Sequence, residues 1–212
     1  MSDRKPAVLV TGGSAGIDRQ VDLADVDATR NAVVELAARY EITSFVHNAG
    51  VIRPDFIEDV KLEDVEYLTG LHIHAGILLL QGVLESMKAA KFGRIVIVGS
   101  RAMLGLQRRT AYAATKAAQL GLVRTWAMEL GEHGITANLV APGPIVTDMF
   151  TDLVAEDSDQ AIRLAQSLPV KRLGRPDDVA RAVMFLLSPA NGFITGQCLF
   201  VCGGASLGAL HL

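Results

Sequence analysis

Residues 8–17 read VLVTGGSAGI, and this stretch decides the fold. An apolar run of strand length leads directly into a glycine-rich turn. Glycines allow a tight turn and let the backbone come close to a phosphate group, whose charge the N-terminus of a following helix favours. The stretch therefore predicts the first strand of a sheet and a phosphate-binding turn, although a glycine cluster alone also fits an ordinary turn.

Four more short apolar runs, rich in β-branched residues, follow this strand, and helical patterns separate them. The first run lies at residues 7–10, and the later four lie at residues 44–47, 94–98, 135–140 and 198–201. The helical patterns lie at residues 26–40, 61–90, 111–132 and 176–188. Alternation of strand and helix predicts an α/β fold with a doubly wound parallel sheet. At 212 residues the chain fits one domain, residues 1–212.

A second informative stretch reads YAATK at residues 112–116, and Tyr112 stands twelve residues after Ser100. Tyr112 and Lys116 occupy positions i and i+4 of a predicted helix, so they share one face about one turn apart. The lysine charge favours the phenolate and lowers the tyrosine pKa from about 10 toward neutrality. With a serine hydroxyl to hold a carbonyl or alcohol oxygen, the three residues form a candidate proton-transfer site. Taken alone, such a pair is also common on an ordinary helix surface.

Further turns follow predicted strands in a recognisable order. Residues 45–51 read FVHNAGV, residues 141–147 read APGPIVT, and residues 192–197 read GFITGQ before VCGG at 201–204. In this order the motifs resemble the short-chain dehydrogenase/reductase family, including members similar to 3-oxoacyl-acyl-carrier-protein reductases, over essentially the whole chain. The resemblance implies a Rossmann-like fold and an NAD(P)-dependent oxidoreductase that interconverts a secondary alcohol and a ketone. A catalytically impaired binding or scaffold protein, or a lyase or epimerase, stays open on the same fold.

The resemblance also implies catalytic roles. Tyr112 is the general acid in reduction and the base in oxidation, Lys116 binds the nicotinamide ribose, and Ser100 polarises the substrate oxygen. His72, in the segment LHIHA at residues 71–75, replaces an asparagine that the family commonly carries. Histidine can also donate and accept hydrogen bonds, but its charge changes near neutral pH. A core histidine bonded to a backbone carbonyl is an equal alternative.

Cofactor residues are assigned by the same resemblance. The pyrophosphate turn comprises Gly12, Ser14, Gly16 and Ile17, and the adenine lies beside Asp22 and Leu23. The ribose is lined by Asn48, Ala49 and Gly50 together with Tyr112 and Lys116. The nicotinamide carboxamide is held by Pro142, Gly143, Ile145 and Thr147. Ala15 stands where a basic residue often accompanies NADP, so NAD is mildly favoured over NADP.

One region departs from the family pattern. A dinucleotide-binding βαβ unit takes about 30 residues, yet Ile17 is followed at once by Asp18, Arg19 and Gln20 and then by residues 21–23, which resemble the family's third strand. The first helix and second strand are therefore missing between Ile17 and Gln20. Three explanations are open for this missing helix and strand: the segment is disordered and omitted from the sequence, it was deleted by design, or it is naturally absent. The first two explanations are favoured because the other cofactor motifs are intact.

Composition excludes several kinds of partner. The net charge is −3 without a long basic run, which argues against nucleic acid and anionic membranes. The polar start and the lack of an apolar run of about 18 residues argue against a signal peptide and a membrane span, and predict a cytoplasmic protein. Cys198 and Cys202, the only cysteines, lie too far apart on one strand for a disulfide, and no metal site is expected.

The sequence gives less information on the substrate and on the oligomeric state. Arg101, Arg108 and Arg109 lie between the serine and the tyrosine. They can attract an anionic or polar substrate, or form a solvated loop or subunit contact, and the second interpretation is favoured. Residues 150–166 resemble the family's mobile substrate-binding helix pair. The resemblance and the alanine-rich predicted helices indicate a homotetramer or homodimer that acts on a small-molecule carbonyl or alcohol.

Overall fold

The computed structural model describes residues 4–13 and 20–207 and contains a five-stranded sheet in the order β1-β2-β3-β4-β5. Each neighbouring pair is parallel. The strands are β1 (Lys5–Val10), β2 (Tyr40–His47), β3 (Gly93–Val98), β4 (Ile135–Pro142) and β5 (Cys198–Val201). The predicted α/β fold with a Rossmann-like parallel sheet is confirmed.

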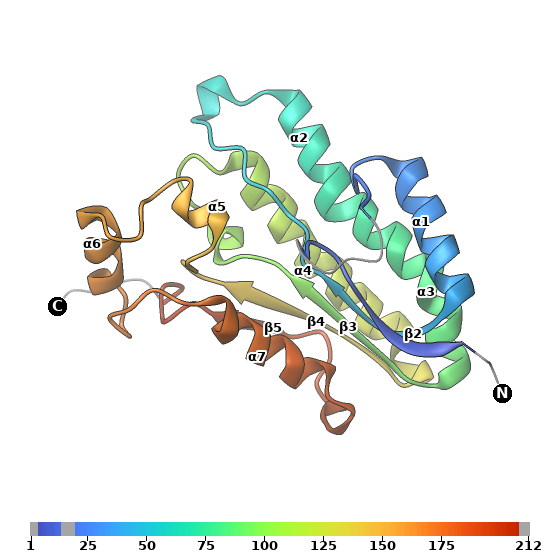
Figure 1. Cartoon of the computed structure of the whole chain (residues 1–212). Coiled ribbons are helices and arrows are strands. Elements are labelled where there is room, and N and C mark those ends of the chain that lie inside the picture. Colours follow the sequence, from blue (N-terminus) through green and yellow to red (C-terminus); the bar gives the residue numbers. More distant parts are fainter. Residues whose placement is uncertain (1–3, 14–19, 208–212) are drawn as a thin grey trace.

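Helices cover both faces of this sheet (Figure 1). On one face lie α1 (Val26–Arg39), α3 (Ala75–Ala90) and α4 (Thr110–Leu130), and α7 (Pro176–Leu187) lies on the other. The remaining helices are α2 (Leu62–Thr69), the π-helix η2 (Gly70–His74), α5 (Asp148–Thr151) and α6 (Asp159–Ser167). Short 3₁₀ turns occupy Ile57–Asp59, Arg101–Leu104, Gly131–His133 and Pro189–Asn191.

The core has a large and a small layer. Phe45, Ile95 and Leu139 are fully buried between the sheet and the helices α1, α3 and α4. Val96 and Val140 are buried on the opposite face, under α7. Because both faces of β3 and β4 are covered, these strands read as continuous apolar runs rather than as alternating patterns.

The helix that follows the β2 loop is long and apolar. Leu62–Ala90 forms 29 helical residues and is apolar enough to cross a membrane by length and composition alone. Half of its most apolar window is buried inside the protein, where Leu79, Leu80 and Val83 pack into the core. This segment therefore has the burial of a core helix.

Residues 21–23 do not form the third strand that the sequence predicted, and that prediction was wrong. They lie in a loop and turn, in which Asp22 Oδ1 accepts from Ala24 N at 3.0 Å. In a doubly wound sheet the third strand pairs with the second. Residues 11–25 are too few for a helix followed by a strand, and the described residues contain no second strand that this segment could join. β1 is consequently an edge strand, with Val8 52% and Val10 54% exposed.

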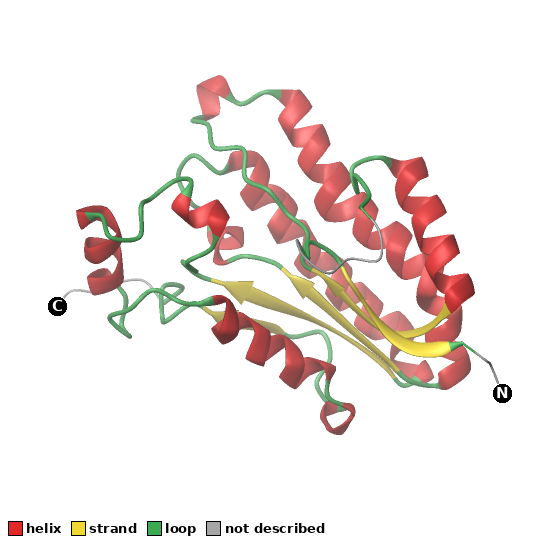
Figure 2. Cartoon of the chain, in the orientation of Figure 1, coloured by secondary structure: helices red, strands yellow, loops and turns green. Residues whose placement is uncertain are grey.

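Loops that follow the strands meet at one edge of the sheet (Figure 2). Gly12 follows β1, Asn48 follows β2, Gly99 and Ser100 follow β3, and Gly143 follows β4. In open parallel sheets, ligands bind outside the carboxyl ends of the strands. The fold thus brings motifs that are far apart in the sequence to one place.

Candidate functional site

A cavity of about 1350 Å³ lies at the carboxyl ends of the strands. It brings together most of the residues assigned from the sequence: Gly12, Asn48, Ala49, Gly50, Ser100, Tyr112, Lys116, Pro142, Gly143, Ile145 and Thr147. Asp22 and Leu23 are not among its lining residues. Ser14, Gly16 and Ile17 lie outside the described residues, so their assignment stays a prediction.

Tyr112 and Ser100 face each other in this cavity. Tyr112 lies in the first turns of α4 and is 9% exposed. Burial raises the pKa of Tyr112, while a hydrogen bond with Ser100 and the charge of Arg109 act in the opposite direction. Ser100 Oγ accepts from Ala102 N at 3.1 Å, which fixes the hydroxyl at the start of a 3₁₀ turn. The phenol is therefore protonated at neutral pH.

Lys116 is buried, and its ammonium turns toward the sheet. Its Nζ donates to Val98 O at 2.9 Å and lies 5.7 Å from the centre of the Tyr112 ring. Burial lowers the pKa of Lys116 to about 7. The sequence predicted that Lys116 lowers the pKa of Tyr112, and the structure shows a raised pKa instead. The reason is that both groups are desolvated, and that Lys116 itself loses much of its charge near neutrality.

His72 lies in the π-helix η2 with 0% exposure. Its Nδ1 lies 2.9 Å from Thr115 Oγ1. The hydroxyl proton of Thr115 goes to the carbonyl of Ala111 or Tyr112, each at 3.1 Å. The tautomer with its proton on Nδ1 satisfies both contacts of Thr115, which then accepts from His72 and donates to the carbonyl. In this tautomer Nε2 is a lone-pair acceptor. Among the described residues this Nε2 has no hydrogen-bond partner.

The neutral state of His72 is strongly favoured. Burial, followed by the charge of Lys116, lowers the pKa of His72 to about 3. The expectation that its charge changes near neutral pH was therefore wrong, because burial disfavours the charged imidazolium. A Cβ on Gly50 would meet His72 Nε2 at 3.0 Å and Lys116 Nζ at 3.4 Å. The unpartnered acceptor and the lysine thus border the same small space beside Gly50.

Thr11 and His47 connect the first two turns, and sequence reasoning gave Thr11 no role. Thr11 Oγ1 accepts from Asn48 N and from Ala49 N, both at 3.0 Å, and lies 3.0 Å from His47 Nδ1. His47 Nε2 is 3.2 Å from Leu71 O. His47 is 1% exposed and is the last residue of β2. The position of Thr11, directly before the first glycine of the turn, was the sequence signal that could have indicated this role.

Gly12 makes the close approach of these two turns possible. It has φ +72°, and a Cβ there would lie 2.8 Å from Ala49 Cα and N. Only glycine adopts this conformation readily and leaves the backbone space free. The first turn is thus held against Ala49 at the floor of the cavity.

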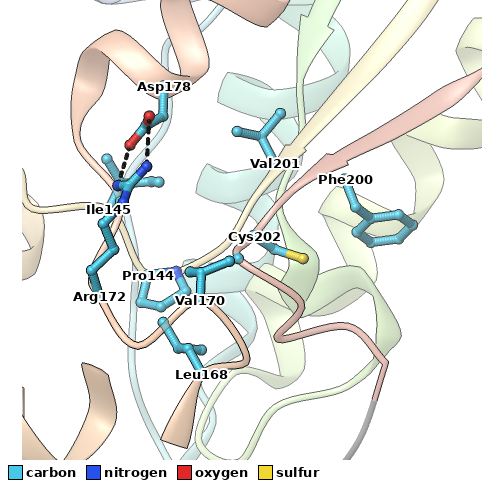
Figure 3. Close-up of a pocket in the computed structure, with 11 residues that line it drawn as sticks. Pro144, Ile145, Leu168, Val170, Arg172, Asp178, Phe200, Val201 and Cys202 are labelled. Carbon is cyan, nitrogen blue, oxygen red and sulfur yellow. Dashed lines mark hydrogen bonds and ion pairs between the residues drawn. The ribbon is translucent and has the colours of Figure 1, made fainter. Parts of the chain in front are cut away.

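A smaller cavity of about 260 Å³ adjoins the site (Figure 3). Arg172 closes one side through two bonds to Asp178, at 2.7 and 3.1 Å. Cys202 is buried at its wall, and Cys198 and Cys202 are both free thiols, as expected. No group of three His, Cys, Asp or Glu residues that could hold a metal ion occurs in the part of the chain that the structure describes.

The fold and the cavity together define a class of protein. A parallel α/β sheet with a glycine turn after β1, and a serine, a tyrosine and a lysine in the cavity at its carboxyl ends, is typical of NAD(P)-dependent oxidoreductases. Residues 3–206 match the family described as Enoyl-(Acyl carrier protein) reductase. The chain belongs to the short-chain dehydrogenase/reductase family, and it is an NAD(P)-dependent oxidoreductase by class.

Individual relatives support this assignment. A subunit of (2S)-[(R)-hydroxy(phenyl)methyl]succinyl-CoA dehydrogenase from Thauera aromatica is 39% identical over 184 residues, which cover 87% of this chain and 72% of the relative. A 3-oxoacyl-[acyl-carrier-protein] reductase from Synechocystis sp. is 34% identical over 206 residues, which cover 96% of this chain and 81% of the relative. A crystal structure of a gluconate 5-dehydrogenase from Burkholderia cenocepacia in complex with NADP and tartrate is 31% identical, with a TM-score of 0.82 and coverage of 89% and 74%.

The described residues fit the nicotinamide end of NAD(P). The evidence is the unpartnered Nε2 of His72, which lies with Lys116 beside Gly50, next to the cavity that Tyr112 and Lys116 line. The cofactor class predicted from the sequence is confirmed, since solved relatives contain NADP or NADPH. The mild preference for NAD stays a prediction. The residues predicted to contact the adenine do not share this cavity, because Asp22 and Leu23 are not among its lining residues.

Proposed function

We propose that the chain interconverts a ketone and a secondary alcohol of a small molecule, with Tyr112 as general acid and base. The observation that carries this proposal is the convergence of Ser100, Tyr112 and Lys116 in one cavity at the carboxyl ends of the strands. When bound, NAD(P) supplies or accepts the hydride. The protein's own residues orient the substrate and move the proton.

In the reduction direction, Tyr112 donates its phenolic proton to the substrate oxygen. The raised pKa of Tyr112 keeps this proton in place at neutral pH. Ser100 holds the same oxygen with its hydroxyl, whose position is set by the bond from Ala102 N. A buried site excludes water and strengthens both interactions. Oxidation of an alcohol requires the phenolate and is therefore favoured at higher pH.

Lys116 and His72 support the proton transfer. Charged Lys116 stabilises the phenolate that forms as Tyr112 gives up its proton. Lys116 has three donors, of which one goes to Val98 O. The neutral His72 Nε2 can accept a hydrogen bond in the space that both groups border, directly or through a water. We therefore assign His72 a positioning role toward Lys116, in place of the family's asparagine.

Cofactor binding is assigned to the residues around the same cavity. As the resemblance implies, Asn48, Ala49 and Gly50 would line the ribose, and Gly12 would lie at the pyrophosphate. The carboxamide side would be held by Pro142, Gly143, Ile145 and Thr147. Thr147 Oγ1 accepts from Phe150 N at 3.3 Å and begins α5, so the carboxamide side is tied to the segment that borders the substrate.

The variant Tyr112→Phe tests the proposed mechanism. It removes only the acidic hydroxyl, and we expect NAD(P)H-dependent ketone reduction to fall by about 10²–10⁴-fold. Thermal unfolding should stay within a few degrees of the wild type. The control Tyr67→Phe removes a phenol outside the cavity and should keep full activity. Residual activity of Tyr112→Phe above about a tenth of wild type would show that another group donates the proton.

A catalytically impaired binding or scaffold protein is the second candidate. The observation that favours it is the shortness of residues 11–25, which join β1 to α1 and are too few for a helix and a strand. Turnover that depends on Tyr112 distinguishes the enzyme from this alternative.

We also propose that the protein is a homo-oligomer that associates through α4. Ala114, Ala117, Ala118 and Gly121 lie exposed on this helix, and Met128 on it is 78% exposed. Small exposed side chains allow helices to pack closely against each other. An apolar helix face of this kind is stabilised by burial against a second copy.

A further inference from the structure

The three arginines between Ser100 and Tyr112 have different surroundings. Arg108 is exposed, has φ +60°, and places its guanidinium 5.4 Å from the centre of the Phe56 ring. Arg101 Nη1 donates to Ala205 O at 3.3 Å, which ties the Ser100 turn to the C-terminal loop. Arg109 lines the large cavity. Arg101 also lines this cavity but is bonded to the C-terminal loop, whereas Arg108 stacks on Phe56 and is not among the lining residues.

Arg109 presents unused hydrogen-bond donors. It is the residue that precedes α4, and its carbonyl accepts from Ala113 N at 2.6 Å, so its backbone is fixed one turn from Tyr112. Its Nη1 donates to Arg108 O at 3.0 Å. Within residues 4–13 and 20–207, Nε and Nη2 of Arg109 have no hydrogen-bond partner and its guanidinium has no carboxylate partner. A guanidinium carries five N–H donors in a rigid fork, so most of its donors are free.

The cavity wall carries more positive than negative charge. Its cationic side chains are Arg101, Arg109 and Lys116, and Asp148 is its carboxylate among the described lining residues. Burial and the charge of Arg108 both disfavour the charged form of Arg109. A partly desolvated cation without a counterion is costly unless a ligand supplies the opposite charge. Apolar side chains, among them Leu106 and Phe150, also line the cavity.

We propose that the substrate carries a carboxylate close to its reacting carbon and that Arg109 binds this carboxylate. Two N–H groups of one guanidinium match the two oxygens of a carboxylate, which fixes orientation as well as charge. With the carboxylate on Arg109, a carbonyl a few bonds away reaches Ser100 and Tyr112. The substrate class is thus a small keto acid or hydroxy acid. This inference rests on the proposed function for its chemistry, but not for the anion site.

The test compares an acid with its neutral ester. Acetoacetate and methyl acetoacetate present the same ketone, and only the first carries a carboxylate. For the wild type we expect kcat/KM for the acid to exceed that for the ester by about tenfold or more. Arg109→Gln should lower kcat/KM for the acid by about 10–100-fold, which is the loss expected for a charge-assisted hydrogen-bonded pair. The same variant should change kcat/KM for the ester less than threefold. Arg108→Gln, a neighbouring exposed arginine, should leave both within twofold.

Malonate binding separates this inference from the redox proposal. Malonate has no ketone, and its binding is measured by saturation-transfer NMR without turnover. Binding that Arg109→Gln weakens at least tenfold, and Arg108→Gln does not, supports the anion site even if neither ketone is reduced, in which case only the redox proposal fails. Equal malonate binding in wild type and Arg109→Gln, or a wild-type preference for the ester that Arg109→Gln leaves unchanged, overturns the inference.

Discussion

Lys116 shows how burial sets the chemistry of a single residue. Among the described residues its ammonium has one hydrogen bond, to Val98 O, and burial lowers its pKa to about 7. In the unfolded chain a lysine has a pKa of about 10.4. Between these values the unfolded state binds more protons than the folded state, so stability increases as pH rises from about 7 toward 10. Below pH 7 the folded protein holds a charged, poorly solvated amine.

Lys116→Met should therefore stabilise the protein while it abolishes turnover. We expect the free energy of unfolding to rise by about 2–4 kcal/mol at pH 6, after the lost bond to Val98 O is deducted. The gain should shrink above pH 7 and disappear above about pH 11, where the wild-type lysine is neutral in both states. Denaturant unfolding at several pH values measures this, with exposed Lys88→Met as control. A gain in the free energy of unfolding that does not depend on pH would contradict the burial of the Lys116 charge as its cause.

His72 allows a second test at the level of one side chain. His72→Asn keeps a neutral hydrogen-bonding group and should retain most of the activity, whereas His72→Leu should lower kcat by about 10–100-fold. Because the pKa of His72 is about 3, the pH profile of kcat/KM between pH 5 and 8 should show the transition of Lys116 near 7 and none from histidine. Equal activity of the Leu variant would leave His72 with a packing role only.

Individual site residues were predictable from the sequence to different degrees. The motifs predicted that Ser100, Tyr112 and Lys116 share one site, and all three line the same cavity. The directions of the pKa shifts of Tyr112 and His72 were not predictable, because both depend on burial by residues far away in the sequence. The hydrogen bonds of Thr11 to Asn48 and Ala49 were not predictable for the same reason.

At the scale of elements, hydrophobic patterns predicted the strands and the main helices within a few residues. Strand β1 extends over Lys5–Val10 where the pattern indicated 7–10, and α7 begins at Pro176, where Asp178 accepts from Arg175 N at 2.9 Å. The π-helix η2 was not predicted, since its residues fit an ordinary helix pattern. The strand predicted at residues 21–23 does not form for a reason that lies in the tertiary structure. A strand needs a neighbouring strand to pair with, and the local sequence pattern does not show whether one is present.

Helix α4 carries the proposed contact between subunits, and Gly121 tests it. A Cβ at Gly121 meets nothing within 4 Å, so Gly121→Glu fits the single subunit, and it also raises helix propensity. We expect light scattering to show an oligomer for the wild type and a monomer for Gly121→Glu, with Gly121→Ala as a matched small control. A monomeric wild type at micromolar concentration, or an oligomer that survives Gly121→Glu, would contradict the contact through α4.

At the scale of the whole molecule, the strand order explains the shape of the site. The described sheet runs from β1 to β5 in one direction, so β1 is its edge and Val8 and Val10 lack a covering element. In a doubly wound fold, further strands beyond β1 provide the wall for the adenine. We therefore expect the described protein to enclose the nicotinamide end of a dinucleotide more completely than the adenine end.

The last prediction follows from this asymmetry and concerns cofactor affinity. Charge-assisted hydrogen bonds contribute about 1.5–3 kcal/mol each, so the loss of two at the pyrophosphate weakens binding by roughly two to four decades. We expect NADH to bind in the millimolar range, within about tenfold of reduced nicotinamide mononucleotide, which lacks the adenosine half. Fluorescence titration of both ligands measures the ratio. Intact mass must accompany it, because a mass about 3–5 kDa above 22.6 kDa indicates an additional segment of roughly 30–40 residues, the size of one βαβ unit. Micromolar NADH binding at a mass of 22.6 kDa, far tighter than the mononucleotide, would show that the missing helix is not needed.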